Sequence, residues 1–591
     1  AMGGREVGGL SNLLSAHRDL ANPAHRAEVA TLWGVPSVPE KPGKTAVEMF
    51  QAAADGEIKA LWIACTNPAQ SMPDQATVRR ALERAEFVVL QEAFATTATA
   101  RYADLLLPAT TWGEKEGTVT NSERRISRVR AAVPAPGNAS SGPRHDWSIA
   151  VDFAQRLEAN LRPAEPSLFA YPTPESVWNE HRESTRGRDL DITGMHYAML
   201  DVAPQQWPCP ADQSIGKARL YEDGVFPTPD GRARFADVQY RPVAEPQDAR
   251  YPLALTTGRL RDQWHGMSRT GTLGRLFGHV AEPVLQMHPQ DMGRRLLKDG
   301  DLVHVTSRRG SIVAPVQTAP AQGVGQVFMA MHWGEEYLSG SSSTGHRLAG
   351  VNALTNPAFC PDSKQPEFKH AAVKVLKADM PWSLLAMAWL PADHVLSVLS
   401  EMRTLMPHFA FASCVPFSRM QGGMERTGVQ FRASHHDPVP AEVLQKIEHL
   451  LQLDNPLALH YVDRKKGQRR VAVLHHGETS TTLEGFMLAG DTSAQAWIST
   501  LLQDALPANP YGGALLLAGA KPPVPVVDQG KPVCMCFGVT DKTIQSELTR
   551  CKGSEPERLT ALQDKLKCGT HCGSCVPQLQ RMVRASVEAT V

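Results

Sequence analysis

The sequence predicts a multidomain chain of mixed α/β and β class, with an α/β region first, a β-rich region next and a small helical region at the C-terminus. Three observations predict this. Helix-like and strand-like runs alternate in residues 1–160, short β-branched runs follow in residues 246–376, and six of the ten cysteines lie beyond residue 530. With 591 residues, the chain is also too long for one hydrophobic core, since such cores stop growing near ~250 to 300 residues.

The composition excludes several classes of protein. Hydrophobic residues make up 42% of the chain and charged residues 21%, as in globular proteins rather than disordered ones. Lys plus Arg number 61, as do Asp plus Glu, so no net charge attracts nucleic acid or an anionic membrane. The apolar run from Ser383 to Leu399 is broken by Pro391 and Asp393. We therefore expect no nucleic acid partner and no membrane-spanning helix.

Residues 1–245 are predicted to form an α/β layer. The runs LWIAC and FVVLQ each follow a helix-period segment and end in a polar loop, which is typical of buried parallel strands. Ligands of such sheets bind at the loops that follow the strands. Within this region, residues 161–245 are rich in Pro and short polar clusters, which predict long surface connections.

Residues 246–376 are predicted to form a β-barrel domain. The runs YPLALTTGR, DLVHVTSRRGSIVAPVQ and GQVFMAMHW are short, β-branched and bounded by Gly or Asp-Gly. Residues 377–528 are predicted to form a mixed α/β connecting domain and a linker. That part contains one clear amphipathic helix, in PAEVLQKIEHLLQL, and carries no catalytic signature.

Residues 529–591 form the cysteine-rich tail, in which four cysteines form two close pairs. One residue separates Cys534 from Cys536, and two separate Cys572 from Cys575. The helical patterns between the pairs would bring them together, and two thiolate pairs can supply two ligands to each iron of a 2Fe-2S cluster. On spacing alone, a structural zinc site with the same four thiolates is the alternative.

The segments VCMCFGVTDKTI and LKCGTHCGSCVPQL resemble the bacterioferritin-associated ferredoxin-like 2Fe-2S domain. The resemblance implies a 2Fe-2S cluster bound by Cys534, Cys536, Cys572 and Cys575. The tail also contains Cys568, where that family usually has a small residue, and Cys551, which has no counterpart there. Both are therefore expected to be ordinary thiols.

The segment TTGRLRDQWHGMSRTG suggests a phosphate site. Thr257, Gly258 and Arg259 follow an apolar strand, and a glycine-containing turn with a cation can close around phosphate. Taken alone, such turns are commonly structural. By the same reasoning Trp264 is more often a core residue, and His265 is more often a satisfied polar residue than a metal ligand.

Together with five other segments, this stretch resembles the molybdopterin oxidoreductase superfamily, and specifically the bacterial assimilatory nitrate reductases. The other segments are AMGGREVGGL, CTNPAQSMPD, ADLLLPATTWGEKEGTVTNSERR, RHDW and NALTNPAFCPDSKQPEFKHAAVKV. The resemblance implies a Rossmann-like α/β layer, a double-psi type barrel that binds the pterin dinucleotide, and one molybdenum held by two molybdopterin guanine dinucleotides. The implied cofactor-binding residues are Asn67, Gln91, Glu92, Lys115, Asp146, Thr257, Gly258, Arg259, Gln263, Trp264, His265, Gly266, Asn352 and Lys369.

The side chains suit these implied roles. Carboxylates such as Asp146 can accept hydrogen bonds from guanine or ribose, and Lys115 and Lys369 can neutralise phosphate. Without the resemblance, each lysine would be interpreted as a solvated surface charge. Glu92 stands where relatives often have Asp, which puts its contact in doubt.

The GGREVGG segment differs from its counterpart in the related formate dehydrogenases, so Arg5 is the catalytic candidate. The resemblance places Arg5 near the molybdenum, where a guanidinium can orient planar nitrate through two hydrogen bonds. A structural ion pair is the alternative role. The implied reaction is reduction of nitrate to nitrite by oxygen-atom transfer. The rivals are a formate dehydrogenase or another molybdopterin oxidoreductase, and a non-catalytic electron-transfer subunit.

The resemblance also implies an electron route and a compartment. Electrons would enter at the 2Fe-2S tail from an NADH-dependent flavoprotein subunit, a ferredoxin or a flavodoxin, and assimilatory relatives work in the cytoplasm. Superfamily members begin with a 4Fe-4S domain, whereas this sequence opens within a motif that lies further along in relatives. A 4Fe-4S cluster is therefore expected in an N-terminal part that precedes the given residues.

Overall fold

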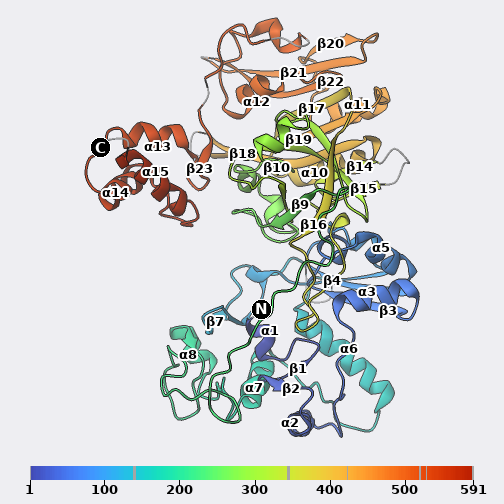
Figure 1. Cartoon of the computed structure of the whole chain (residues 1–591), viewed down its shortest axis with the longest axis vertical. Helices are drawn as coiled ribbons and strands as arrows, with labels where there is room; N and C mark the ends of the chain where they lie inside the picture. The colour runs from blue at the N-terminus through green and yellow to red at the C-terminus, as the bar shows by residue number, and fades with distance from the viewer. Residues whose placement is uncertain are drawn as a thin grey trace. The chain divides into compact units, whose positions relative to one another are not determined.

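A computed structural model describes residues 2–137, 141–341, 347–421, 424–478, 480–517, 521–527 and 529–588. The chain is a mixed α/β and β multidomain protein, as the sequence predicts (Figure 1). It divides into two compact units. Unit 1 comprises Ala1–Thr66, Arg80–Ala95 and Ala100–Pro242, and unit 2 comprises Asn67–Arg79, Thr96–Thr99 and Val243–Val591.

Unit 1 is built around a parallel three-stranded sheet of β3 (Ala60–Ala64), β4 (Phe87–Glu92) and β5 (Leu105–Pro108). Helices α3 (Ala46–Asp55) and α5 (Gln75–Arg84) precede β3 and β4, so the predicted alternation is confirmed. A capping box between Thr45 and Glu48 starts α3, and Gly56 ends it in the left-handed conformation.

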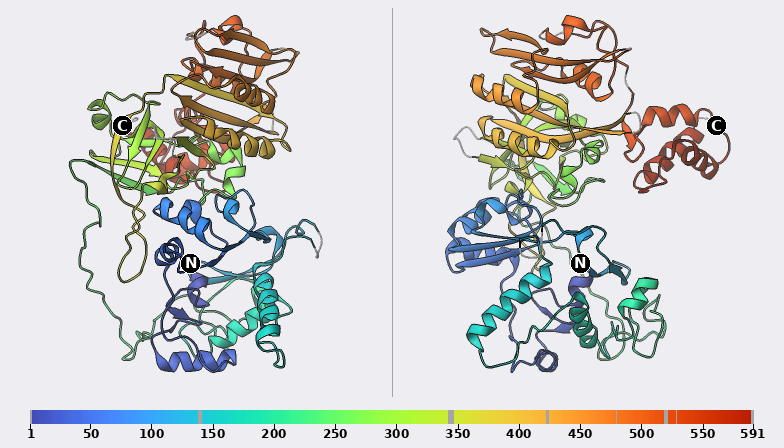
Figure 2. Two further views of the ribbon diagram at one scale, coloured as in Figure 1. Left: turned by 90° about the vertical axis from the view of Figure 1, so that its right-hand side faces the viewer. Right: turned by 180° about the vertical axis from the view of Figure 1, so that it is seen from behind.

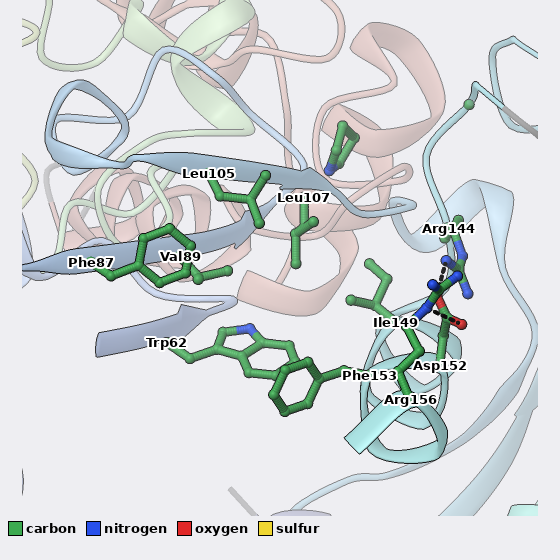
Figure 3. A pocket seen from close by; sticks show the side chains of 12 residues that line it. Trp62, Phe87, Val89, Leu105, Leu107, Arg144, Ile149, Asp152, Phe153 and Arg156 are labelled. Carbon is green, nitrogen blue, oxygen red and sulfur yellow. Dashed lines mark hydrogen bonds and ion pairs between the residues drawn. The ribbon is translucent and has the colours of Figure 1, made fainter. Parts of the chain in front are cut away.

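One face of this sheet is open, which the sequence did not predict. Trp62, Phe87 and Leu105 are 39%, 45% and 42% exposed. The expectation of fully buried strands is therefore wrong for this face, because an apolar cavity lies between it and α6 (Asp146–Leu161). The rings of Trp62 and Phe153 of α6 lie 4.9 Å apart in the wall of an apolar cavity of about 380 Å³ (Figure 3).

The rest of unit 1 consists of short elements. They are α1 (Met2–Glu6), β1 (Leu13–Leu14), β2 (Arg18–Asp19), α2 (Pro23–Trp33), β6 (Gly117–Thr120), β7 (Arg125–Val129), α7 (Pro174–Ser184), α8 (Tyr197–Val202) and β8 (Gln205–Gln206). Helices α7 and α8 interrupt the predicted long connection. From the end of β8 to residue 252 the chain contains no helix or strand, as the extended green trace in Figure 2 shows.

Unit 2 contains a closed six-stranded barrel, which confirms the barrel prediction. Its order is β10-β12-β11-β16-β9-β13. The strands are β9 (Leu253–Gly258), β10 (Leu285–Met287), β11 (Leu302–Thr306), β12 (Ser311–Thr318), β13 (Gln326–Ala330) and β16 (Ala371–Lys377), with α9 (Pro289–Gly293) after β10. The β9–β13 and β10–β12 pairs are parallel, and the other pairs are antiparallel.

The connecting region forms an antiparallel eight-stranded sheet of order β15-β14-β18-β19-β17-β22-β21-β20. The strands are β14 (Leu338–Ser341), β15 (Arg347–Ala349), β17 (Trp382–Leu390), β18 (Phe411–Gln421), β19 (Met424–His435), β20 (Leu459–Asp463), β21 (Gln468–His476) and β22 (Thr481–Ala489). Because strand side chains alternate, β17 supplies Leu384 to the core shared with α10 (Val395–Leu405) and α11 (Ala441–Leu450), and Leu385 to the core shared with α12 (Gln495–Gln503). Helix α11 is the predicted amphipathic helix.

The tail is a small, mainly helical domain. It consists of β23 (Pro532–Cys534), β24 (Val539–Thr540), α13 (Asp541–Leu548), α14 (Glu555–Leu566) and α15 (Val576–Glu588) (Figure 1). Val533, Ile544, Leu562 and Leu579 are fully buried in its core. Across the parts of the chain that the structure describes, no helix has both the length and the apolar composition needed to cross a bilayer.

Candidate functional site

Arg5 lies exposed on α1, and its guanidinium bonds to no residue that the structure describes. The helix is anchored by its neighbour Glu6, which is buried and accepts hydrogen bonds from Thr120 Oγ1 (2.7 Å) and Trp207 Nε1 (2.6 Å). Gly8 has φ +75°, and a Cβ there would lie 2.5 Å from the backbone of Leu14, so only glycine fits this turn. The GGREVGG segment therefore presents the Arg5 guanidinium, which has no partner among the described residues, beside the turn that Gly8 fixes.

A second group of predicted residues meets in unit 1 at the carboxyl ends of the parallel strands. The Asp146 carboxylate accepts hydrogen bonds from Lys115 Nζ (2.7 Å), from buried Gln91 Nε2 (2.9 Å) and from Cys65 Sγ (3.5 Å). Glu92, the last residue of β4, accepts the backbone N–H of Ala93 at 2.7 Å. Lys115 is therefore a paired side chain rather than a solvated surface charge.

The charges of this group fix its protonation. Burial acts against the charged form of Asp146, but hydrogen bonds from Lys115 and Gln91 outweigh it and hold the pKa of Asp146 below its ordinary value. For Cys65, burial and then the negative charge of Asp146 raise the pKa of the thiol to about 11. The group is a protonated thiol beside an ionised, lysine-paired carboxylate.

This arrangement predicts unequal thiol reactivity. At pH 8 a pKa near 11 leaves about one Cys65 thiol in a thousand ionised, whereas N–H and O–H groups of Ser363 lower the pKa of exposed Cys360. Iodoacetamide should therefore label Cys360 much faster than Cys65, as followed by mass spectrometry of the two peptides. Asp146→Asn should speed labelling of Cys65 and leave Cys360 unchanged. Equal wild-type rates at the two exposed thiols would contradict the assignment.

In unit 2 the predicted loop begins at the end of β9. Thr257 Oγ1 donates a hydrogen bond to Phe368 O (2.6 Å), which ties the strand end to the residue before Lys369. A Cβ on Gly258 would lie 2.9 Å from the ring of Phe328, so glycine allows this close packing. Gln263 is buried and donates from Nε2 to Leu276 O (3.1 Å). The loop is therefore fixed on the barrel.

Cations gather around Trp264. The guanidinium groups of Arg259 and Arg269 lie 5.2 and 5.7 Å from the centre of its ring, and the His265 ring lies 4.5 Å from it, edge to face. Burial, and then the charges of Arg259 and Arg269, lower the pKa of His265. No described residue pairs a carboxylate with Arg259, Arg269 or exposed Lys369. Three unpaired cations on adjacent segments fit a phosphate-bearing ligand.

Three more predicted residues meet beside this loop, through a residue that sequence reasoning missed. Gln70 O accepts from buried Asn352 Nδ2 (2.8 Å), and a Cβ on Gly266 would lie 2.7 Å from Gln70 Oε1. Asn67 occupies the N-cap position of the short helix α4 (Pro68–Ser71) without a capping side-chain hydrogen bond, and its Oδ1 accepts instead from Thr99 N (3.0 Å). The Asn67–Gln70 turn, the Gly266 loop and Asn352 thus pack into one group in unit 2, in which Asn352 is hydrogen-bonded to Gln70.

Glu336, also missed, is part of this group. Its Oε1 accepts hydrogen bonds from Asn67 Nδ2 (3.3 Å) and Ala98 N (2.8 Å), and its Oε2 is inaccessible to solvent and has no partner among the described residues. Burial, and then the charge of Glu335, raise the pKa of Glu336. Its charged form therefore opposes folding.

Because folding raises the pKa of Glu336, removing its charge should stabilise the protein at high pH. A carboxyl group whose pKa is raised by folding destabilises the folded state progressively as pH rises above the unfolded-state value, about 4.3. Glu336→Gln keeps an acceptor and removes the charge, so its melting temperature should exceed that of the wild type at pH 8 and match it near pH 4.5. Each kcal/mol corresponds to roughly 2–4 °C in domains of 150–250 residues.

Glu448→Gln is the control, because Glu448 is a buried carboxylate of the same unit that forms an ion pair with Arg469, so this variant should lose stability instead. A Glu336→Gln protein that melts below the wild type at pH 8 would contradict the assignment of a costly buried charge. Differential scanning calorimetry at the two pH values supplies both comparisons.

The tail brings its four predicted cysteines into two pairs. Cys536 Sγ and Cys572 Sγ lie 3.3 Å apart, and the free thiols of Cys534 and Cys575 form a hydrogen bond with each other. Two pairs of thiols are the arrangement that a 2Fe-2S cluster needs, with two thiolates for each iron. Buried Cys568 instead donates to Leu562 O (3.8 Å), as expected for an ordinary thiol.

Three parts of the chain match known protein families. Residues 2–156 match the family described as molybdopterin oxidoreductase. This part of the chain is a molybdopterin oxidoreductase domain. The barrel region, residues 253–372, matches the molybdopterin dinucleotide-binding domain, and residues 532–585 match the BFD-like 2Fe-2S binding domain.

Several curated proteins are similar to this chain. A nitrate reductase of Klebsiella oxytoca is 34% identical over 99% of this chain and 62% of its own length. A nitrate reductase of Synechocystis sp. is 41% identical over 64% of this chain and 51% of its own length. The assimilatory nitrate reductase catalytic subunit of Bacillus subtilis is 34% identical over 63% and 50%. The chain therefore spans about half to three-fifths of these relatives.

Proposed function

We propose that this chain belongs to an enzyme that reduces nitrate to nitrite in nitrate assimilation. The observation that carries the proposal is the likeness to the Klebsiella nitrate reductase, because it extends over 99% of the chain and so includes all three matched domains. The unpaired cations around Trp264 and the two thiol pairs of the tail support it, since they suit a phosphorylated cofactor and an iron-sulfur cluster.

The proposed roles follow from the side chains. A bis(molybdopterin guanine dinucleotide) molybdenum centre, when bound, supplies oxygen-atom transfer from nitrate, at the expense of two electrons and two protons with release of water. Arg259 and Lys369 would neutralise its phosphates, and the Asp146 group would face its polar edges. Arg5 would attract nitrate and orient it through two hydrogen bonds.

The remaining predicted residues take supporting roles in the same proposal. Asn67, Gln91, Glu92, Lys115, Thr257, Gly258, Gln263, Trp264, His265, Gly266 and Asn352 are proposed to shape the two cofactor-binding groups, directly or through hydrogen bonds. In the tail, Cys534, Cys536, Cys572 and Cys575 are proposed to hold the 2Fe-2S cluster. These side chains contribute binding and orientation rather than bond making.

The proposal also covers the domain boundaries, the type of barrel, the electron donor and the compartment. We place the domain boundaries at residues 1–245, 246–376, 377–528 and 529–591, and assign the barrel to the double-psi type, which its two parallel strand pairs support. Electrons would enter at the tail from an NADH-dependent flavoprotein subunit, a ferredoxin or a flavodoxin. The enzyme would work in the cytoplasm, as assimilatory enzymes do.

Two measurements test the proposed function. The purified holoprotein should contain molybdenum and pterin, and should form nitrite from nitrate with reduced methyl viologen. It should not oxidise formate with oxidised viologen. Formate oxidation without nitrate turnover would reject the substrate, and a preparation that incorporates neither molybdenum nor pterin would point to a non-catalytic electron-transfer protein.

A further inference from the structure

His332 connects the two ends of the loop that carries most of the predicted dinucleotide contacts. It lies two residues after β13, and its side chain is fully buried. Its Nε2 accepts the backbone N–H of Leu260 (2.9 Å), and its Nδ1 bonds to the carbonyl oxygen of His265 (2.5 Å). One imidazole ring therefore spans the whole segment from Leu260 to His265.

The two partners fix the state of the ring. A backbone N–H can only donate and a carbonyl oxygen can only accept, so Nε2 carries the lone pair and Nδ1 carries the hydrogen. Burial, and then the nearby charges of Arg259, His265 and Lys369, favour this neutral form and lower the pKa of His332, against the bond to His265 O. A lysine, an arginine or an aliphatic residue could not supply both bonds.

The backbone of the same residue joins the loop to a second predicted segment. Gln70 Nε2 donates to Met331 O (3.1 Å) and to His332 O (3.5 Å), and Gly266 packs against the Gln70 amide. His332 thus contacts the loop through its ring and the Asn67–Gln70 turn through its backbone. Its position determines how these two segments of unit 2 approach each other.

We propose that His332 is a positioning residue that holds the dinucleotide-binding loop in its binding shape. The ring fixes the ends of the segment that carries Trp264, and so keeps the Trp264 ring in contact with Arg259 and Arg269, the cations proposed to bind phosphate. This inference rests on the proposed function for the identity of the ligand. The hydrogen-bonded clamp itself rests only on the geometry of unit 2.

Three substitutions at His332 separate the two bonds. His332→Phe removes both. The amide of His332→Gln reaches the position of Nε2 and can accept from Leu260, whereas the amide of His332→Asn reaches only the position of Nδ1 and can donate to His265. His304→Gln is the matched control, because His304 is a half-buried histidine of β11 in the same barrel that does not bond to the loop.

Hydrogen exchange at the Leu260 amide, resolved by fragmentation mass spectrometry of the holoprotein, is the primary measurement. We expect exchange to be about 10-fold or more faster in the Phe and Asn variants, and close to wild type in the Gln variant and the control. Pterin dinucleotide content, measured by fluorescence after oxidation, should fall several-fold in the Phe and Asn variants and less in the Gln variant.

Wild-type exchange at Leu260 in both the Phe and the Asn variants would overturn the clamp. Faster exchange with unchanged dinucleotide content would overturn the positioning role. If the Phe variant does not fold, the comparison of Asn with Gln decides the question. A wild-type protein that binds no dinucleotide would reject the proposed function, while the exchange at Leu260 would still support or overturn the clamp.

Discussion

Cys572→Ser is expected to remove the 2Fe-2S cluster completely. The thiols of Cys572 and Cys536 lie 3.3 Å apart as one of the two pairs of the tail, and each iron of such a cluster needs two thiolates. A serine hydroxyl stays protonated at neutral pH and does not replace the thiolate. The visible absorption, the electron paramagnetic resonance signal of the reduced cluster and the bound sulfide should therefore all be lost.

Cys568→Ser is the matched control, since Cys568 lies in the same domain but is buried and bonds to Leu562 O. This variant should keep the full cluster signal and differ from the wild type only in stability. A Cys572→Ser protein that retained iron and sulfide would contradict the ligand assignment. A wild-type tail that contained zinc and no sulfide would establish the zinc alternative instead.

Arg5→Met is expected to lower kcat/KM for nitrate by about 10- to 150-fold, because hydrogen bonds to a charged group are worth about 1.5–3 kcal/mol. Arg5 is exposed on α1, and no described residue competes for its guanidinium. Arg5→Lys should retain the charge but cannot form two parallel hydrogen bonds to nitrate, so its decrease in kcat/KM should be intermediate. Steady-state rates of nitrite formation measure both effects.

The control for Arg5 is Arg241→Met, which removes another exposed arginine without a described partner, in the extended segment after β8. It should leave kcat/KM unchanged. The molybdenum content of all three variants must match the wild type, so that the comparison reports on nitrate alone. Unchanged kinetics in Arg5→Met, at full molybdenum content, would reject the substrate role.

Local patterns predicted the individual elements well. The apolar spacing in residues 440–453 predicted α11, and the β-branched runs of residues 246–376 predicted strands of the barrel. The eight-stranded sheet was not predicted. Two of its strands, β14 and β15, come from within residues 246–376, and β14 pairs with both β15 and β18. Such long-range pairing leaves no periodic trace in one sequence.

In the candidate site, too, local motifs could be predicted and long-range contacts could not. Resemblance supplied the motif residues, and the structure brings Asn67, Gly266 and Asn352 into one group. Gln70, Glu336 and His332 were missed, because their importance lies in bonds to residues far along the chain. The open face of the β3-β4-β5 sheet was missed for a related reason, since apolar strand composition does not reveal what covers it.

The division of the chain into units has a practical consequence for cloning. The boundary falls inside α5, and the chain changes unit five times before residue 244. An expressed fragment that starts at Val243 would omit Asn67, Gln70 and Thr99, and would leave the Glu336 carboxylate and the Met331 carbonyl without their donors. Truncation at any single codon therefore cannot isolate an intact dinucleotide module, although the missing peptide supplied in trans could complement it.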